Sequence, residues 1–278
     1  MILSVAANWH MTYQCNYQCS FCFFRNPVDR NDMKPRLSIS IEMAYELIRR
    51  LKDSGIKRIN FAGGEPSLVS ELPLILKYSH SLGIVNTLVT NGTGITENLM
   101  KQIQGNIRAI KLSIDSSDDE VEKKLGRGYG QHIKTTIKAA EVLQKFGVEV
   151  MANTVVTSLN WMDDMHSILE RIQPSRWKVF QVLPVKDQNS KEYNDLKISE
   201  AQFLEFKKRH EDLKCMVAEN NSLMTESYVM IDPLGKFFQN SNSNYTFSES
   251  ILEVGFKSTF NQIHFDKKKY DQREKGNE

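Results

Sequence analysis

The sequence predicts an α/β protein built on a parallel β-sheet. Runs dense in Val, Ile, Leu and Phe recur along the first two thirds of the chain, and an amphipathic helical pattern separates each run from the next. Strands that are buried on both faces have this composition. Six such β-then-α units indicate right-handed crossovers in a parallel sheet, which is either open or curved into a partly closed barrel.

The elements follow in a regular order along the chain. Strands are expected at 2–11, Arg58–Ala62, Val85–Thr90, 109–115, Glu149–Val156 and 177–183. The first helix begins at the capping residue Ser40, carries an apolar stripe that includes Leu47 and Leu51, and ends at Gly55. Further helices are expected at Leu72–Ser81, 133–146, 162–172 and 203–215.

The regular alternation weakens from about Lys186 onward. Polar loops occur at 187–195 and 239–245, and a charged tail occupies 267–278. We therefore divide the chain into a barrel at 1–185 and a C-terminal extension at 186–278, which packs on the barrel and covers the substrate site. The charged tail is expected to be solvated.

Composition and charge exclude several classes of protein. The 278 residues are 40% hydrophobic and 25% charged, as in an ordinary globular protein. No apolar run reaches the roughly 18 residues that a membrane span needs, and a net charge of +2 provides no overall field for nucleic acid. With four cysteines and no secretory signal, the chain is expected to be cytoplasmic, without membrane or direct nucleic acid binding.

Three of the four cysteines, Cys15, Cys19 and Cys22, form a C-x3-C-x2-C run. Iron–sulfur clusters are held by cysteine sulfur. A four-iron cluster offers four corners, so three ligands leave one iron open, as catalytic metal sites do. Two other interpretations are weaker: disulfides belong to oxidising compartments, and a structural zinc site needs a fourth ligand. His10 is placed awkwardly for that role.

Residues whose side chains can bind ligands or take part in catalysis follow the ends of the predicted strands. The cysteine run follows the first strand, and Gly63-Gly64-Glu65 follows the second. Ligands of parallel α/β folds bind at the carboxyl ends of the strands. Alone, the Gly-Gly-Glu run is equally compatible with a simple turn. Its glycines also permit close approach of the backbone to a ligand, and its carboxylate can bind an ammonium group.

The cysteine run with the following Phe23, together with the Gly63-Gly64-Glu65-Pro66 run, resembles the radical S-adenosylmethionine (SAM) superfamily. The resemblance implies a partial (β/α)6 barrel and a 4Fe–4S cluster held by the three cysteines. It also implies that SAM chelates the open iron and that the Gly-Gly-Glu segment binds the SAM amino group. By position, further SAM-lining residues are Phe21, Thr90, Asn91 and Ser113.

Longer runs narrow the resemblance to prokaryotic members of the viperin family. They are Asp115-Ser-Ser-Asp-Asp-Glu-Val, Gly126-Arg-Gly-Tyr-Gly130, Arg176-Trp-Lys-Val-Phe-Gln181 and Ser227-Tyr-Val-Met-Ile-Asp232. The family converts a nucleoside triphosphate, typically CTP, to its 3′-deoxy-3′,4′-didehydro form, a chain terminator. The resemblance therefore implies a nucleotide dehydratase for phage defence, with CTP favoured and UTP or GTP as other substrates.

The resemblance also implies the order of the chemistry. SAM is cleaved to methionine and a 5′-deoxyadenosyl radical, and this radical takes the 4′ hydrogen of the ribose. The 3′ hydroxyl then leaves as water, and one electron and one proton complete the product. An electron donor of the flavodoxin or ferredoxin type is therefore an expected partner.

A triphosphate requires several cations, and Arg offers a bidentate fork where Lys offers a point charge. The positions that match the family's phosphate ligands are Arg58, Arg127, Arg176 and Lys178. Asn8 and Asn153 are expected beside the nucleotide, with Asn8 near the base. Tyr228 matches a family tyrosine that can donate hydrogen late in the reaction.

Two positions depart from the family's pattern. The lysine that usually stands two residues before the strand-five asparagine is Met151 here, which removes one expected cation. The strand-two lysine is Arg58, which keeps the charge and changes its geometry. Two alternatives stay open from the sequence: a radical SAM enzyme that acts on a peptide, and a zinc-stabilised binding module. Peptide-modifying members commonly carry extra cysteines, and this chain has one to spare.

Overall fold

The structure, a computed structural model, describes residues 5–25 and 39–275 of the chain. In this part of the chain, ten strands form one sheet, in the order β10-β9-β8-β1-β2-β3-β4-β5-β6-β7. The strands are β1 (Ala6–His10), β2 (Arg58–Ala62), β3 (Val85–Thr90), β4 (Ala109–Ser113), β5 (Glu149–Val156), β6 (Arg176–Gln181), β7 (Met216–Glu219), β8 (Val229–Ile231), β9 (Lys236–Ser241) and β10 (Asn244–Ser250).

The helices fill the intervals between the strands. They are α1 (Ile41–Asp53), η1 (Pro66–Leu68), α2 (Leu72–Ser81), α3 (Glu97–Ile103), α4 (Asp119–Lys124), α5 (His132–Lys145), α6 (His166–Ile172), α7 (Ser190–Leu196), α8 (Glu200–Arg209), α9 (Asn221–Met224), α10 (Ile251–Val254), α11 (Phe256–Phe260) and α12 (Lys267–Lys275). No described helix is long and apolar enough to span a membrane.

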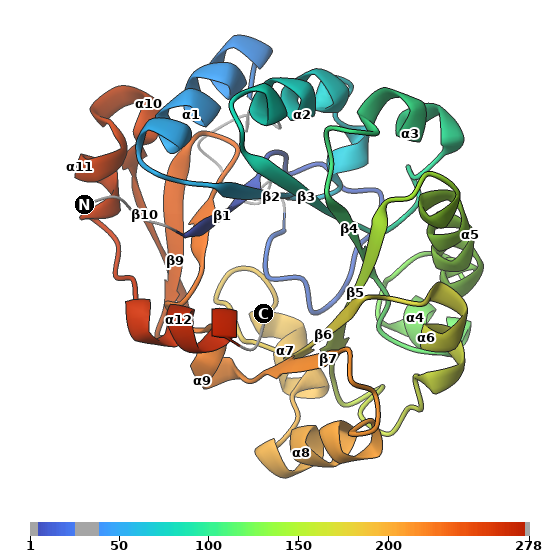
Figure 1. Cartoon of the computed structure of the whole chain (residues 1–278). Helices are drawn as coiled ribbons and strands as arrows, with labels where there is room; N and C mark the ends of the chain where they lie inside the picture. The colour runs from blue at the N-terminus through green and yellow to red at the C-terminus, as the bar shows by residue number, and fades with distance from the viewer. Residues whose placement is uncertain (1–4, 26–38, 276–278) are drawn as a thin grey trace.

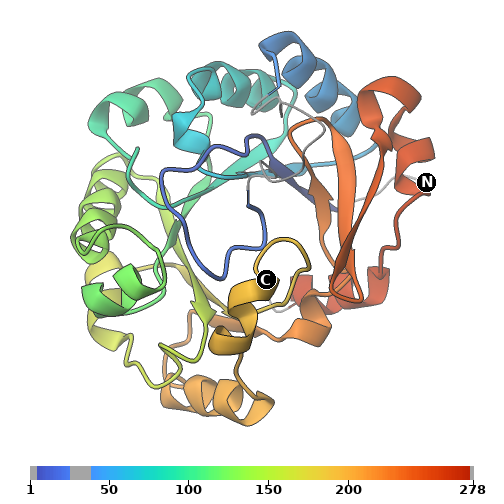
Figure 2. The ribbon, with the colours of Figure 1, turned by 180° about the vertical axis from the view of Figure 1, so that it is seen from behind.

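Strands β1 to β7 run parallel in chain order and curve around a central space, with α1, α2, α3, α5 and α6 outside them (Figure 1). Seen from behind, the loop that follows β1 crosses this space (Figure 2). The predicted parallel sheet of six β-then-α units is therefore confirmed, and of the two predicted forms it takes the partial barrel.

Alternation along the strands places polar side chains inside the barrel and apolar ones under the helices. In β6, Trp177 and Val179 are buried, and the Trp177 ring packs against Phe206 of α8 with 5.9 Å between centroids. Arg176 and Lys178 occupy the opposite, inward face. The barrel interior is therefore rich in hydrogen-bonding groups, while the hydrophobic core lies between the sheet and its helices.

The C-terminal third contributes to both edges of the same sheet. β7 pairs with β6 at one edge, and β8 pairs in parallel with β1 at the other. β9 and β10 continue from β8 as antiparallel strands. The segment that we interpreted as an extension thus continues the sheet that forms the barrel wall.

The prediction of a solvated tail at 267–278 is wrong for the residues that the structure describes. Residues Lys267–Lys275 form α12, whose Tyr270 and Arg273 are buried. The backbone N–H of Ala6 donates to the Tyr270 hydroxyl at 2.8 Å, and Arg273 donates to the carbonyl of Ser227 at 2.9 Å. These two side chains, three residues apart, lie on one face of the helix, so α12 packs despite its high charge.

Several predicted boundaries also differ from the structure. The helix expected at 203–215 begins at Glu200, after a capping box of Ser199 and Gln202, and ends at Arg209. The helix expected at 162–172 begins at His166. The strands expected at 109–115 and 177–183 end at Ser113 and Gln181. The start of the first expected strand lies outside the described residues.

Candidate functional site

A cavity of about 280 Å³ lies inside the barrel beneath the cysteine loop. It brings together most of the residues that the sequence singled out. The predicted site residues that line it are Asn8, Cys15, Cys19, Phe21, Cys22, Gly63, Gly64, Glu65, Thr90, Asn91, Ser113, Arg127, Asn153 and Tyr228. Arg58, Arg176 and Lys178 do not line it.

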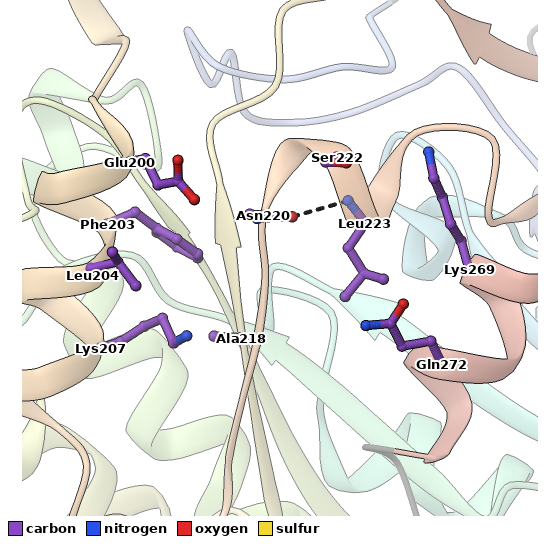
Figure 3. A pocket seen from close by; sticks show the side chains of 10 residues that line it. All are labelled: Glu200, Phe203, Leu204, Lys207, Ala218, Asn220, Ser222, Leu223, Lys269 and Gln272. Atoms are coloured by element: carbon purple, nitrogen blue, oxygen red, sulfur yellow. Dashed lines mark hydrogen bonds between the residues drawn. The ribbon is translucent and has the colours of Figure 1, made fainter.

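A second cavity, of about 310 Å³, lies between α8, β7, α9 and α12 (Figure 3). Phe203, Leu204 and Lys207 border it from α8, and Lys269 and Gln272 border it from α12. None of the predicted site residues lines it. The first cavity is therefore the candidate site.

The Gly63-Gly64 turn holds the cysteine loop against the end of β2. Gly64 N–H donates to the Thr12 carbonyl at 2.7 Å, and Glu65 N–H donates to the Gln14 carbonyl at 2.7 Å. A Cβ on Gly64 would lie 2.0 Å from the Gln14 carbonyl oxygen, which no side chain tolerates. The glycine therefore permits this close approach of two backbones, and it brings Glu65 to the same cavity as the thiols.

The three clustered cysteines are free thiols that all border the cavity. Burial raises the pKa of Cys19 to about 12 and also raises the pKa of Cys15 and Cys22. Thiols in such surroundings stay protonated until a metal displaces the protons. Three sulfur donors on one loop, without a disulfide among them, fit the three-ligand iron–sulfur cluster that the sequence predicts.

The Glu65 carboxylate is buried and anchored by neighbouring strand ends. Its Oε1 accepts from the Ser67 backbone N–H at 3.0 Å, from the Ser67 hydroxyl at 2.6 Å and from the Thr90 hydroxyl at 2.7 Å. Its Oε2 accepts from the Asn91 N–H at 2.8 Å. A carboxylate oxygen can accept at least two hydrogen bonds, so Oε2, which accepts one, retains capacity for a ligand donor such as an ammonium group.

Arg127 lies beside the cysteine loop and apart from the other predicted phosphate ligands. Its guanidinium lies 5.2 Å from the centre of the Phe21 ring and pairs with Asp115, which is fully buried. Burial and the charge of Asp115 raise the pKa of Glu122, and burial also raises the pKa of Asp115, while the positive charge of Arg127 acts against both shifts. The predicted grouping of Arg127 with the other cations is therefore not seen.

The other predicted cations occupy the opposite half of the barrel interior. Arg58 and Arg176 are the first residues of β2 and β6, so they lie at the end of the barrel remote from the cysteines. Arg58 pairs with Glu274 of α12. Lys178 Nζ lies 2.6 Å from Glu219 Oε1, and this carboxylate is fully buried. The expectation that chemistry gathers at strand carboxyl ends thus holds for the thiols and Glu65 and fails for these cations.

Tyr228 connects the cavity to the half of the barrel interior that holds Arg58, Arg176 and Lys178, here called the cationic half. It lines the cavity, and its hydroxyl donates to Glu219, which also accepts from Lys178. The guanidinium of Arg273 lies 3.6 Å from the centre of the Tyr228 ring. Burial raises the pKa of Tyr228 well above its ordinary value, so the phenol stays protonated.

Sequence reasoning missed Lys111, Glu219 and Arg273 as members of this group. The Lys111 ammonium donates to Asn60 Oδ1 at 3.0 Å inside the barrel. A lysine in the middle of the apolar strand Ala109–Ser113 was a signal that was present in the sequence. Glu219 begins the run Glu219-Asn220-Asn221, which also resembles the viperin family, but the resemblance alone assigns this carboxylate no partner. Arg273 gains its position from α12, for which no motif was available.

Several buried polar atoms that face the cavity have no hydrogen-bond partner among the described residues. They are His10 Nδ1, Asn153 Oδ1 and Asn240 Oδ1. Burial lowers the pKa of His10 to about 3, so its ring is neutral. Buried polar groups are normally satisfied, and three unsatisfied atoms around one cavity indicate that it receives a polar ligand.

A second group of potential metal ligands lies outside the barrel. Asp164, His166 and His210 place one ligand atom each within 4.8 Å of one another. Existing bonds already account for His210, because its Nε2 accepts from the Met165 N–H at 3.0 Å and its Nδ1 donates to the Phe206 carbonyl at 2.8 Å. His166 bridges Asp164 and Asp212. This group is fully explained as a junction between α6 and α8.

Comparison with known proteins gives a consistent result. Residues 9–172 match the Radical SAM superfamily. An S-adenosylmethionine-dependent nucleotide dehydratase of Flammeovirga pacifica is 35% identical over 271 residues, which cover 96% of this chain and 93% of the relative. The S-adenosylmethionine-dependent nucleotide dehydratase RSAD2 of Oncorhynchus mykiss is 32% identical, with 96% and 78% covered.

Among solved structures, Streptococcus suis SuiB bound to S-adenosylmethionine superposes with a TM-score of 0.70. The superposition covers 98% of this chain and 68% of SuiB, at 15% sequence identity. At that identity, the likeness shows a shared fold and no more.

Proposed function

Because this chain belongs to the radical SAM superfamily and, within it, to the S-adenosylmethionine-dependent nucleotide dehydratases, we propose that it removes water from a nucleoside triphosphate. The product is the 3′-deoxy-3′,4′-didehydro nucleotide. The observation that carries this proposal is the juxtaposition of a thiol-lined cavity with a group of cations in one barrel, joined through Tyr228 and Glu219. A nucleotide has the matching division into a neutral nucleoside and an anionic phosphate chain.

The enzyme uses a 4Fe–4S cluster and SAM, the cofactors of its superfamily. When bound, they supply a 5′-deoxyadenosyl radical that takes the ribose 4′ hydrogen. In our proposal Cys15, Cys19 and Cys22 hold the cluster, and the open acceptor site on Glu65 binds the SAM amino group. Phe21, Thr90, Asn91 and Ser113 complete the SAM side of the cavity, and Arg127 with its partner Asp115 borders it.

The substrate extends from this cavity into the cationic half of the barrel. Asn153, whose Oδ1 lacks a partner among the described residues, and Asn8 contact the nucleoside. Arg58, Arg176 and Lys178 bind the phosphates. Tyr228 lies between the two regions and is proposed to donate hydrogen late in the reaction, after the 3′ hydroxyl has left as water. Enclosure by the barrel excludes bulk water from the reacting ribose.

Further proposals concern the preferred nucleotide, the biological role of the product and the electron donor. We propose CTP as the preferred substrate, with UTP or GTP as other substrates, and the product as a chain terminator in phage defence. One electron is needed to complete the product, and a flavodoxin or ferredoxin in the cytoplasm is the proposed donor.

Anaerobic reconstitution with iron, sulfide, SAM and a reductant tests the proposed function. The enzyme is supplied in turn with CTP, UTP, GTP and ATP, and 5′-deoxyadenosine and the nucleotide product are quantified by mass. We expect one nucleotide to stimulate 5′-deoxyadenosine release and to lose the mass of one water. If no nucleotide does either, the proposal is wrong, and peptides become the next substrates to examine.

A further inference from the structure

The barrel interior carries more positive than negative charge in its cationic half. In the described chain, five cationic side chains influence one another there, against two carboxylates, Glu219 and Glu274. The cations are Arg58, Lys111, Arg176, Lys178 and Arg273. Partly buried charges of one sign that lie near one another are costly unless they are compensated, so the protein presents a site that an anion with several charges would complete.

Lys111 is the member of this group with the least compensation. Its Nζ donates to Asn60 Oδ1 at 3.0 Å, and within the described residues no carboxylate lies at ion-pair distance from it. Arg58 and Lys178 have Glu274 and Glu219. Burial and the neighbouring cations lower the pKa of Lys111 to about 7. Both the contacts and the charge balance indicate that Lys111 lacks an anionic partner.

Lys111 also lies where the sequence led us to expect a missing cation. Lys111 and Met151 are register partners on the neighbouring strands β4 and β5. They lie side by side on the inward face, so a lysine at either position projects into the same part of the interior. The charge that Met151 does not supply from β5 is therefore available from β4.

We propose that Lys111 binds the phosphate chain of the substrate from β4, in place of a cation at position 151. This inference rests on the proposed function for the identity of the anion, a nucleoside polyphosphate. A phosphate chain that runs from the cavity past Asn60, which lines the cavity, reaches the Lys111 ammonium.

The same contact fixes the orientation of Asn8. In the anion-bound state the Lys111 ammonium only donates, so Asn60 turns its carboxamide oxygen toward Lys111, and the Thr87 hydroxyl donates to that oxygen at 2.8 Å. Asn60 Nδ2 then donates to Asn8 Oδ1 at 2.8 Å. The Asn8 NH2 group then remains free to donate to the substrate. Through Asn60, Lys111 therefore orients Asn8 so that it offers a donor to an acceptor atom of the nucleoside.

The test compares four proteins: the parent enzyme, Lys111→Met, Lys111→Met with Met151→Lys, and Lys101→Met as a control on the exposed face of α3. Inorganic tripolyphosphate and CTP are titrated into each cluster-loaded enzyme in the presence of SAM. Lys111→Met should weaken both ligands by at least about tenfold, the effect of one charge-assisted hydrogen bond. The double variant should recover most of this loss, and Lys101→Met should bind as the parent does.

Thermal unfolding of the ligand-free proteins separates lost binding from lost folding. Lys111→Met removes a partly buried charge that has no carboxylate partner and lies near other cations, so it should unfold at the same temperature as the parent or higher. Unchanged tripolyphosphate and CTP affinity in Lys111→Met would overturn the inference, as would a double variant no better than the single one. If no nucleotide is dehydrated but tripolyphosphate binding still depends on Lys111, the proposed reaction fails and the anion site stands.

Discussion

The Thr90 hydroxyl donates a 2.7 Å hydrogen bond to the buried carboxylate of Glu65, and so joins the ends of β2 and β3 beneath the cysteine loop. With the two groups of Ser67, this bond occupies Oε1 and directs Oε2 to the remaining donors. The carboxylate is therefore held in one orientation before any ligand binds.

Glu65→Gln should weaken SAM binding by about tenfold or more. The substitution puts an NH2 group where Oε2 accepts from Asn91, and it removes the charge that attracts an ammonium group. SAM affinity is measured by titration of the cluster-loaded enzyme. Ser67→Ala is the matched control, because it removes one anchoring bond to Oε1, leaves Oε2 unchanged and does not alter the cavity lining. A larger loss of SAM affinity in Ser67→Ala than in Glu65→Gln would contradict the assignment.

Gly64→Ala should prevent normal seating of the cysteine loop, because the new Cβ would meet the Gln14 carbonyl oxygen at 2.0 Å. We expect a large fall in iron and sulfide bound per chain after anaerobic reconstitution. Gly105→Ala controls for general destabilisation, since its Cβ would meet nothing within 4 Å and its positive φ alone costs about 1 kcal/mol. Equal iron contents in the two variants would argue against the role of this close approach.

Cys22→Ala should abolish cluster binding, because it removes one of three sulfur donors. Iron content and the visible absorption of the reconstituted protein report the loss. Cys215→Ala is the control: this half-buried thiol lies just before β7 and does not line the cavity, and the variant should keep its full iron complement. A cluster that survived in Cys22→Ala would show that the ligands are assigned wrongly.

Tyr228→Phe should uncouple SAM cleavage from product formation. The hydroxyl lies at the junction of cavity and cations and donates to Glu219. We expect 5′-deoxyadenosine to form while the yield of dehydrated nucleotide per 5′-deoxyadenosine falls severalfold. Tyr270→Phe removes a hydroxyl that accepts from Ala6 outside the cavity, so it should lower stability by about 1 kcal/mol and leave the yield unchanged. A normal yield in Tyr228→Phe would exclude it as hydrogen donor.

Anion binding should be accompanied by proton uptake near pH 8. The pKa of Lys111 is lowered from 10.5 to about 7 by burial and by Lys178, Arg58 and Arg176, with Glu274 acting in the opposite direction. The free protein therefore gains stability as the pH rises from about 7 to 10.5, where the unfolded chain binds the extra proton. A bound phosphate restores the proton to Lys111.

Calorimetric titration of tripolyphosphate in two buffers of different ionisation enthalpy measures this uptake. The parent enzyme should take up close to one proton per anion at pH 8, and Lys111→Met should take up nearly a full proton less. Equal uptake by both proteins would mean that Lys111 keeps its charge state when the anion binds.

The strands were the most predictable part of the structure. β2, β3 and β5 match the predicted bounds residue for residue, because each run is rich in β-branched and apolar residues and each is preceded by a helix-ending glycine, Gly55, Gly83 or Gly147. α12 was not foreseen, because its Lys-rich sequence resembles a solvated tail and its packing depends on Tyr270 and Arg273 meeting β1 and Tyr228. β7 escaped prediction because four residues are too short for a pattern.

The site residues also divide into those that short sequence motifs predict and those that only the fold brings into place. Cys15, Cys19, Cys22 and Glu65 belong to short local motifs, so sequence spacing alone placed them on one cavity. The role of Lys111 depends on which strand lies beside β5 and on which residue faces Met151. The pairing of Arg127 with Asp115 beside Phe21 was not foreseen, because only the fold brings these residues together. Such relations arise from tertiary contacts.

The pairing of β1 with β8 has a consequence for how the chain matures. β1, which leads into the thiol loop, has β2 on one side and β8 on the other, and Ala7 and Val229 are register partners from opposite ends of the sequence. During synthesis, β1 remains an unpaired edge until residue 231 has left the ribosome. Such long-range pairing is slow to form. Iron–sulfur insertion is therefore best timed after translation, when both flanks of β1 are closed.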